Sequence, residues 1–182
     1  MDKSIRIALL VIATALFSCT EKEKFQLTGE RSFNGRYENE YLDRIAFPMG
    51  GIGAGMICLE GTGAISHVSV RNQMRGFHEP CSFAALCVKG EGGNLARVLE
   101  GPVPRHKPLF PWGASVHVGS GSGAPLRSYG LPRFEEASFD ARFPFARVSL
   151  RHSAIPLEVE LTGWSPFIPG NADDSSLPVA AL

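Results

Sequence analysis

The stretch FPMGGIGAGMICLEGTGAISHVSVRN, residues 47–72, decides the fold of this chain. Its glycines suggest at first a dinucleotide-binding loop, which needs G-x-G-x-x-G between a strand and a helix. Gly51 and Gly53 supply the first two glycines, but Met56 occupies the third position and no helix start follows. The glycines are better explained by a sharp turn and close backbone packing at the entry to a sheet.

The residues after these glycines have the pattern of a β-hairpin. Residues 56–59 are apolar and strand-like, and residues 60–63 (EGTG) favour a turn. Residues 65–70 then resume as a strand, with Val68 and Val70 on one face. The stretch therefore predicts two paired strands and no phosphate-binding loop.

Strand patterns continue along the rest of the chain. Residues 82–88 are apolar on both faces, which predicts a buried strand, with residues 96–99 as its partner across a turn. Further strands with period-2 alternation are expected at 134–139, 146–151 and 157–161. Sustained helical periodicity is absent outside the N-terminal region, so the sequence predicts an all-β domain, most simply a two-sheet β-sandwich.

Three regions of the sequence do not continue this regular strand pattern. Residues 25–44 are polar and predict a lead-in with little regular structure, whereas the Pro- and Gly-rich residues 101–132 predict a long surface loop with a short strand at 115–118. Residues 175–182 enter an apolar strand and stop without a turn or polar tail. Because such an edge would leave backbone and apolar surface exposed, we expect the sandwich to be incomplete at its C-terminus.

The N-terminus has the features of an export signal. Lys3 and Arg6 precede the apolar run 7–17, which is too short to span a bilayer but suits the hydrophobic part of a signal peptide. The residues LFSC at 16–19 resemble a bacterial lipoprotein lipobox, which predicts lipidation of Cys19. A free cysteine beside an ordinary cleavage site, or an uncleaved anchor, are the alternatives.

These features divide the chain into three parts: a signal peptide at 1–18, a tether and lead-in at 19–41, and the sandwich at 42–182. The mixed charges of EKEK at 21–24 suit a tether, and they resemble the signals that direct some lipoproteins to the cell surface. We expect a lipid-anchored protein of the bacterial cell envelope, in the outer membrane and facing the periplasm or the surface.

The charge balance argues against nucleic acid as a partner, and the cysteine count argues against a disulfide framework. The chain has 18 basic and 18 acidic residues among its 182, so it offers no basic excess for nucleic acid. After the lipobox, Cys58, Cys81 and Cys87 remain, and at most one disulfide fits. Cys58 and Cys87 lie in apolar strand-like runs, where we expect them to be small buried residues.

The polar motifs indicate no metal, cofactor or catalytic pair. Residues 173–174 (DD) follow Pro and Gly and favour a turn over a calcium site. In residues 78–81 (HEPC) the proline disrupts a metal-binding geometry, and no second ligand pair follows with zinc spacing. No spacing singles out the two carboxylates of a glycosidase, and residues 135–136 (EE) suit a solvated strand rim.

Two tryptophans could stack on sugar rings. Trp164 follows a strand that is expected to be buried, so packing in the core or against a loop is the better interpretation. Trp112 lies in the predicted surface loop and is the candidate sugar contact.

The glycine-rich stretch also resembles the opening of a known domain. FPMGGIGAG (47–55), LEGTG (59–63) and VRN (70–72) are similar to the N-terminal domain of glycoside hydrolase family 116, the family of the non-lysosomal glucosylceramidase, or bile-acid β-glucosidase. Four later motifs agree with this in order: YGLP (129–132), ARFPFA (141–146), GWSPFIP (163–169) and DSSLPV (174–179). The resemblance covers about residues 42–182.

This resemblance implies a function for the parent protein. In that family an N-terminal β-sandwich packs against a C-terminal (α/α)6 barrel, which carries a glutamate nucleophile and an aspartate acid/base for retaining hydrolysis of β-glucosides or, in some members, β-xylosides. Neither catalytic residue has a counterpart here, so we assign no catalytic residue and no cofactor. We expect an inactive scaffold portion of an exported β-glycosidase, whose partners are the barrel and a glycoside substrate. The alternative is a membrane-anchored carbohydrate-binding module that uses Trp112.

Overall fold

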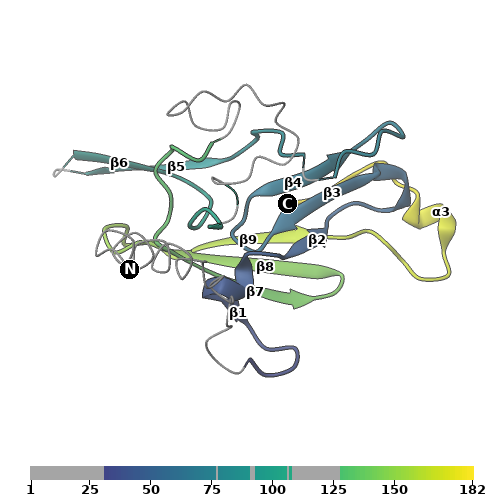
Figure 1. Cartoon of the computed structure of the whole chain (residues 1–182), viewed down its shortest axis with the longest axis horizontal. Coiled ribbons are helices and arrows are strands. Elements are labelled where there is room, and N and C mark those ends of the chain that lie inside the picture. The colour runs from purple at the N-terminus through teal and green to yellow at the C-terminus, as the bar shows by residue number, and fades with distance from the viewer. Residues whose placement is uncertain (1–30, 77, 91–92, 106, 108–127) are drawn as a thin grey trace, which may run out of the picture.

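The computed structural model describes residues 31–76, 78–90, 93–105, 107 and 128–182, and these form antiparallel strands with almost no helix (Figure 1). The elements are β1 (Tyr37–Glu38), η1 (Asn39–Leu42), β2 (Ala46–Pro48), η2 (Ile52–Ala54), β3 (Met56–Glu60), β4 (Ile65–Ser69), β5 (Ala85–Gly90), β6 (Gly93–Val98), β7 (Glu136–Arg142), β8 (Phe145–Arg151), β9 (Val159–Trp164) and α3 (Ala172–Ser175). The predicted all-β class is confirmed. Within the described part of the chain, no helix has the length and hydropathy needed to cross a membrane.

Two sheets form the body of the domain. One sheet has the strand order β1-β7-β8-β9 and the other has the order β2-β3-β4. The two sheets are stacked in Figure 1. The core between them includes Leu59 of β3, Phe139 of β7, and Val148 and Leu150 of β8, each no more than 1% exposed. Because alternate residues of these strands point to the same face, each sheet contributes one apolar face to this core. This is the predicted two-sheet sandwich.

The glycine-rich stretch has the predicted local structure. β3 pairs with β4 in an antiparallel hairpin, and the turn between them includes Gly61 and Gly63. Before this hairpin, Gly51 and Gly53 pack against the carbonyl oxygens of Ser175 and Ser176 at the end of α3, where a Cβ atom would overlap them. The close backbone packing expected of these glycines is confirmed.

The hairpin of β5 and β6 extends from the sandwich as a two-stranded arm (Figure 1). The predicted pairing is confirmed, since Cys87 lies opposite Ala96. However, the expectation that Cys87 is buried is wrong: its side chain is exposed, whereas Leu86 and Val88 pack against the core. Only one face of this arm is covered, and period-2 alternation places Cys87 on the other face. The buried position expected for Cys58 is confirmed.

The expectation that Trp164 packs in the core of the domain is also not met. Trp164 is 40% exposed, and its neighbour across the strand, Phe145, is 51% exposed. The inward position belongs instead to Gly163, where a Cβ would meet Leu59 and Met49. Because the backbone of β9 approaches the facing sheet at this glycine, Trp164 is directed to the outer face of its sheet.

The predicted lead-in has more structure than expected. Tyr37 in β1 pairs with Phe139 of β7, and the two rings meet edge to face with centroids 6.1 Å apart. Leu42 in η1 is buried in the core. These contacts join the residues before β2 to the four-stranded sheet. The strand expected at 115–118 lies outside the described residues.

Candidate functional site

A cluster of buried charges lies at one edge of the sandwich, where three irregular segments meet the end of β3. Glu60 ends β3, and Glu79 lies in the loop after β4, where residues 78–81 have no regular structure. Glu100 follows β6, and Lys107 and Arg133 come from the two described ends of the Pro- and Gly-rich segment. Each of these five side chains is at most 15% exposed.

Lys107 forms the centre of one half of this cluster. Its ammonium group lies between two carboxylates: it bonds Glu60 Oε2 and lies 2.8 Å from Glu79 Oε1. Tyr129 donates its hydroxyl to the same Glu79 carboxylate, at 2.9 Å from Oε2. Both carboxylates are therefore paired and hydrogen-bonded, as burial of a charge requires.

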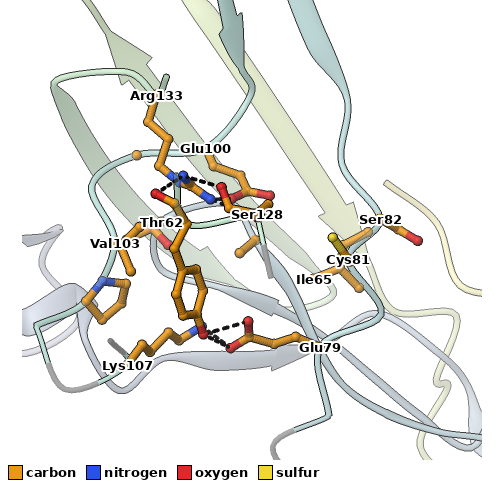
Figure 2. Close-up of a pocket in the computed structure, with 14 residues that line it drawn as sticks. Thr62, Ile65, Glu79, Cys81, Ser82, Glu100, Val103, Lys107, Ser128 and Arg133 are labelled. Atoms are coloured by element: carbon orange, nitrogen blue, oxygen red, sulfur yellow. Dashed lines mark hydrogen bonds and ion pairs between the residues drawn. The ribbon is translucent and has the colours of Figure 1, made fainter. Parts of the chain in front are cut away.

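Arg133 forms the centre of the other half (Figure 2). Its Nη2 donates to Glu100 Oε2 at 2.9 Å and to Ser128 Oγ at 2.8 Å, while its Nη1 donates to the carbonyl oxygens of Ser128, Tyr129 and Leu131. The planar guanidinium suits this role because its five donors can satisfy several acceptors at once. Through Tyr129 the two halves are connected: Arg133 holds its carbonyl and Glu79 accepts from its hydroxyl. We call the six residues Glu60, Glu79, Glu100, Lys107, Tyr129 and Arg133 the charged network.

Burial shifts the pKa of Glu100 in the charged network. Desolvation raises the pKa of Glu100 above its ordinary value of 4.5, although the Arg133 guanidinium acts in the opposite direction. Removal from water is thus the larger influence on this carboxyl group. By contrast, the pKa of the exposed Glu135 is lowered, first by a hydrogen bond from the backbone N–H of Ser153.

The charged network surrounds a pocket that is too small for a sugar. Thr62, Ile65, Cys81 and Val103 are among its other lining residues (Figure 2), and the cavity volume is about 20 Å³. A volume of that order holds about one water molecule, whereas small-molecule sites span about 300–1,000 Å³. Glycoside hydrolysis needs two carboxyl groups that face the glycosidic bond. The acids of this cluster instead face Lys107 and Arg133, an arrangement that supports the surrounding loops.

The structure places several of the sequence-derived candidates apart from this cluster. Cys19 and Trp112 lie outside the described residues. The paired acids at 173–174 lie in the single turn of α3, where Asn171 Oδ1 accepts from the Asp174 backbone N–H at 3.1 Å. The described residues contain no group of three or more His, Cys, Asp or Glu side chains that could hold a metal ion.

Little in the amino-acid sequence indicates the charged network. Residues 78–81 were considered as metal ligands, but the carboxylate of Glu79 binds Lys107 and Tyr129 instead. The pattern of residues 60–63 predicts a turn for Glu60, and no motif includes Arg133. Two features of the sequence point toward the network: Glu60 is an acid at the end of an apolar strand, and Lys107 is a base within a proline-rich segment. No sequence pattern connects Glu60 with Lys107, which lie 47 positions apart.

Comparison with known proteins agrees with the architecture and with the motifs of the glycine-rich stretch. A family model described as beta-glucosidase 2, glycosyl-hydrolase family 116 N-term, matches residues 46–182. A search of curated proteins found no match. The matched region begins at β2 and includes both strands of the glycine-rich hairpin and all six residues of the charged network. The chain therefore belongs to glycosyl-hydrolase family 116, and its sandwich is the N-terminal domain of that family.

Proposed function

We propose that this chain is the non-catalytic N-terminal scaffold of an exported, retaining β-glycosidase that acts on β-glucosides. The family match over residues 46–182 is the observation that carries this proposal. Hydrolysis is then performed by a helical (α/α)6 barrel, which supplies the glutamate nucleophile and the aspartate acid/base. The sandwich positions that barrel and contributes no reacting group and no cofactor.

The geometry of the described residues supports a scaffold role and does not support an active site. The pocket beside the charged network has a volume of about 20 Å³, and the acids Glu60, Glu79 and Glu100 of the network are all held by cations. A general acid must be free to approach the leaving-group oxygen, and a nucleophile must be free to approach the anomeric carbon. Acids that are each held in a buried ion pair do not meet either requirement.

The first prediction concerns activity. The 182-residue chain is expected to release no 4-nitrophenol from 4-nitrophenyl β-D-glucoside above the rate in buffer, because it lacks the catalytic pair. An active β-glucosidase in the same assay serves as the positive control. Turnover that copurifies with the chain and falls on Glu79→Gln would contradict the scaffold proposal.

We also expect the gene to encode a helical-repeat domain in the same polypeptide.

The second prediction concerns attachment to the membrane. We propose that Cys19 is lipidated and anchors the protein in the bacterial cell envelope, since LFSC at 16–19 resembles a lipobox. Cys19→Ala is expected to abolish incorporation of labelled palmitate and to move the protein from the membrane fraction to the soluble fraction. Cys81→Ala is the matched control and should keep the label. Retention of the label by Cys19→Ala would refute lipidation at this position.

A second candidate function is a membrane-anchored carbohydrate-binding module. The exposed aromatic pair of Trp164 and Phe145 on the outer face of the four-stranded sheet favours it, because aromatic faces stack on sugar rings. Trp112 remains the other candidate contact. Binding of a soluble β-glucan that is lost in Trp112→Ala or Trp164→Ala, from a gene without a catalytic domain, would favour the module over the scaffold.

A further inference from the structure

The hydrophobic core and the charged network hold different parts of the chain. The core is built from the strands of both sheets, from η1, from the β5–β6 arm, and from loop residues such as Phe134 and Ile155. The described residues of three stretches, 78–82, 101–107 and 128–133, contribute no side chain to this core cluster. Four of the six residues of the charged network come from these stretches. Gly101 and Pro104 are the only buried members among the described residues of these stretches, so charge pairs, more than apolar burial, attach the three stretches to the sandwich.

We infer that the charged network is a clamp, which fixes these three stretches on the sandwich and allows them to detach together while both sheets remain folded. We call residues 78–82, 101–107 and 128–133 the clamped stretches. Parts of a protein with few buried apolar contacts open with a smaller free energy than its core does. The clamped stretches satisfy that condition among the described residues.

The sharing of partners makes the detachment cooperative. Lys107 serves the carboxylates of both Glu60 and Glu79, and Glu79 also accepts from Tyr129. Arg133 in turn holds the carbonyl of Tyr129 and the carboxylate of Glu100. Removal of Lys107 leaves Glu60 buried without its cation, and removal of Arg133 does the same to Glu100, which is strongly unfavourable. Loss of any one stretch therefore loosens the others.

The backbone contacts of the clamped stretches lie close to their junctions with the sandwich. Gly101 donates its N–H to Thr62 at 2.7 Å, and the N–H of Val98 donates to the carbonyl of Pro132 at 2.9 Å. The carbonyl of His78 accepts from Val68 of β4 at 3.2 Å. These bonds act at the ends of the stretches, so they define the hinges about which the stretches move.

Amide hydrogen exchange of the whole chain tests this inference. Two amides report on the clamped stretches because each has a local backbone bond: Lys107 donates to Pro104 at 3.0 Å, and Leu131 donates to Ser128 at 2.9 Å. Lys107→Met removes the ammonium group but keeps this amide. Arg147→Met is the matched control, because the Arg147–Glu160 pair is about half exposed on the outer face of the four-stranded sheet.

In Lys107→Met we expect exchange at residue 107 and at Leu131 to accelerate by on the order of 100-fold, the factor that loss of a buried ion pair implies. Amides of β7 and β8, and all amides of Arg147→Met, should keep their rates. Unchanged exchange in the clamped stretches of Lys107→Met, or equal acceleration in β7 and β8, would overturn the clamp.

If Lys107→Met does not fold, amide exchange of the wild-type chain in urea tests the same inference. At urea concentrations below the unfolding midpoint, the clamp requires the reporter amides to exchange before those of β7 and β8 do. Exchange of all these amides in a single step would show that the clamped stretches unfold only with the sheets, and would refute the inference.

Discussion

Arg133→Met is expected to lower the free energy of unfolding by about 3–5 kcal/mol, the usual cost of breaking a buried ion pair. The substitution removes the cation from Glu100, whose side chain is only 8% exposed, and removes the guanidinium hydrogen bonds to three backbone carbonyls. Methionine fills a similar volume, so the lost hydrogen bonds and the unpaired acid account for the effect. Urea unfolding at pH 7 measures it.

The size of this effect should depend on pH. Burial already raises the pKa of Glu100 in the folded protein, and without Arg133 we expect it to rise further. The folded state then binds more protons than the unfolded state does between pH 4.5 and the raised pKa, so stability decreases as the pH rises through that range. The difference between wild type and Arg133→Met should thus be smallest at acid pH and grow toward neutrality.

Two variants control for this interpretation. Arg36→Met breaks an exposed ion pair with Asp140, 3.0 Å long, and should change the stability far less than Arg133→Met does. The double variant Arg133→Met/Glu100→Met removes the buried acid together with its cation, and it should regain part of the lost stability. If Arg133→Met were as stable as Arg36→Met, Arg133 would have no stabilising role in the charged network.

Gly53→Ala should lower the free energy of unfolding by about 3 kcal/mol, near the upper end of the usual cost of overpacking. The added Cβ would overlap the carbonyl oxygen of Ser176. Because that atom belongs to the backbone after α3, it is unable to rotate away as a flexible side chain would. The whole segment after α3 has to shift, which separates it from η2.

Gly90→Ala is the matched control for this substitution. Gly90 ends β5, and no described atom lies within 4 Å of the position its Cβ would occupy. Its variant is expected to remain within about 0.5 kcal/mol of the wild type. Equal stabilities of Gly53→Ala and Gly90→Ala would show that the segment after α3 adapts freely, contrary to the close packing seen here.

Much of the fold was predictable because period-2 alternation and turn residues act locally. The β3–β4 hairpin, the β5–β6 pairing and the strands around 136–151 all follow from patterns within a few residues of each other. The motifs of residues 47–72 and 163–179 also carried the resemblance that the family match confirms. Residues 37–42 were missed because two residues of β1 are too few to establish a pattern.

The charged network could not be predicted in the same way. Glu60 and Lys107 are 47 residues apart, and Glu79 and Tyr129 are 50 apart. Their pairing depends on the path of irregular segments, which lack a repeat from which direction or register could be inferred. Exposed and buried charges therefore have the same appearance in the sequence.

The sequence by itself determined the all-β class, the hairpin after the glycines, the absence of a complete nucleotide-binding motif, and the resemblance to family 116. Only the tertiary structure decided which strand faces are covered and which charges meet. Alternation shows that Gly163 and Trp164 point to opposite faces, but not which face the second sheet covers. Packing decides this, because β9 approaches Leu59 and Met49 closely at the glycine and leaves the tryptophan outside. The clamp arises for the same reason, since segments far apart in the chain bury opposite charges together at one edge of the sandwich.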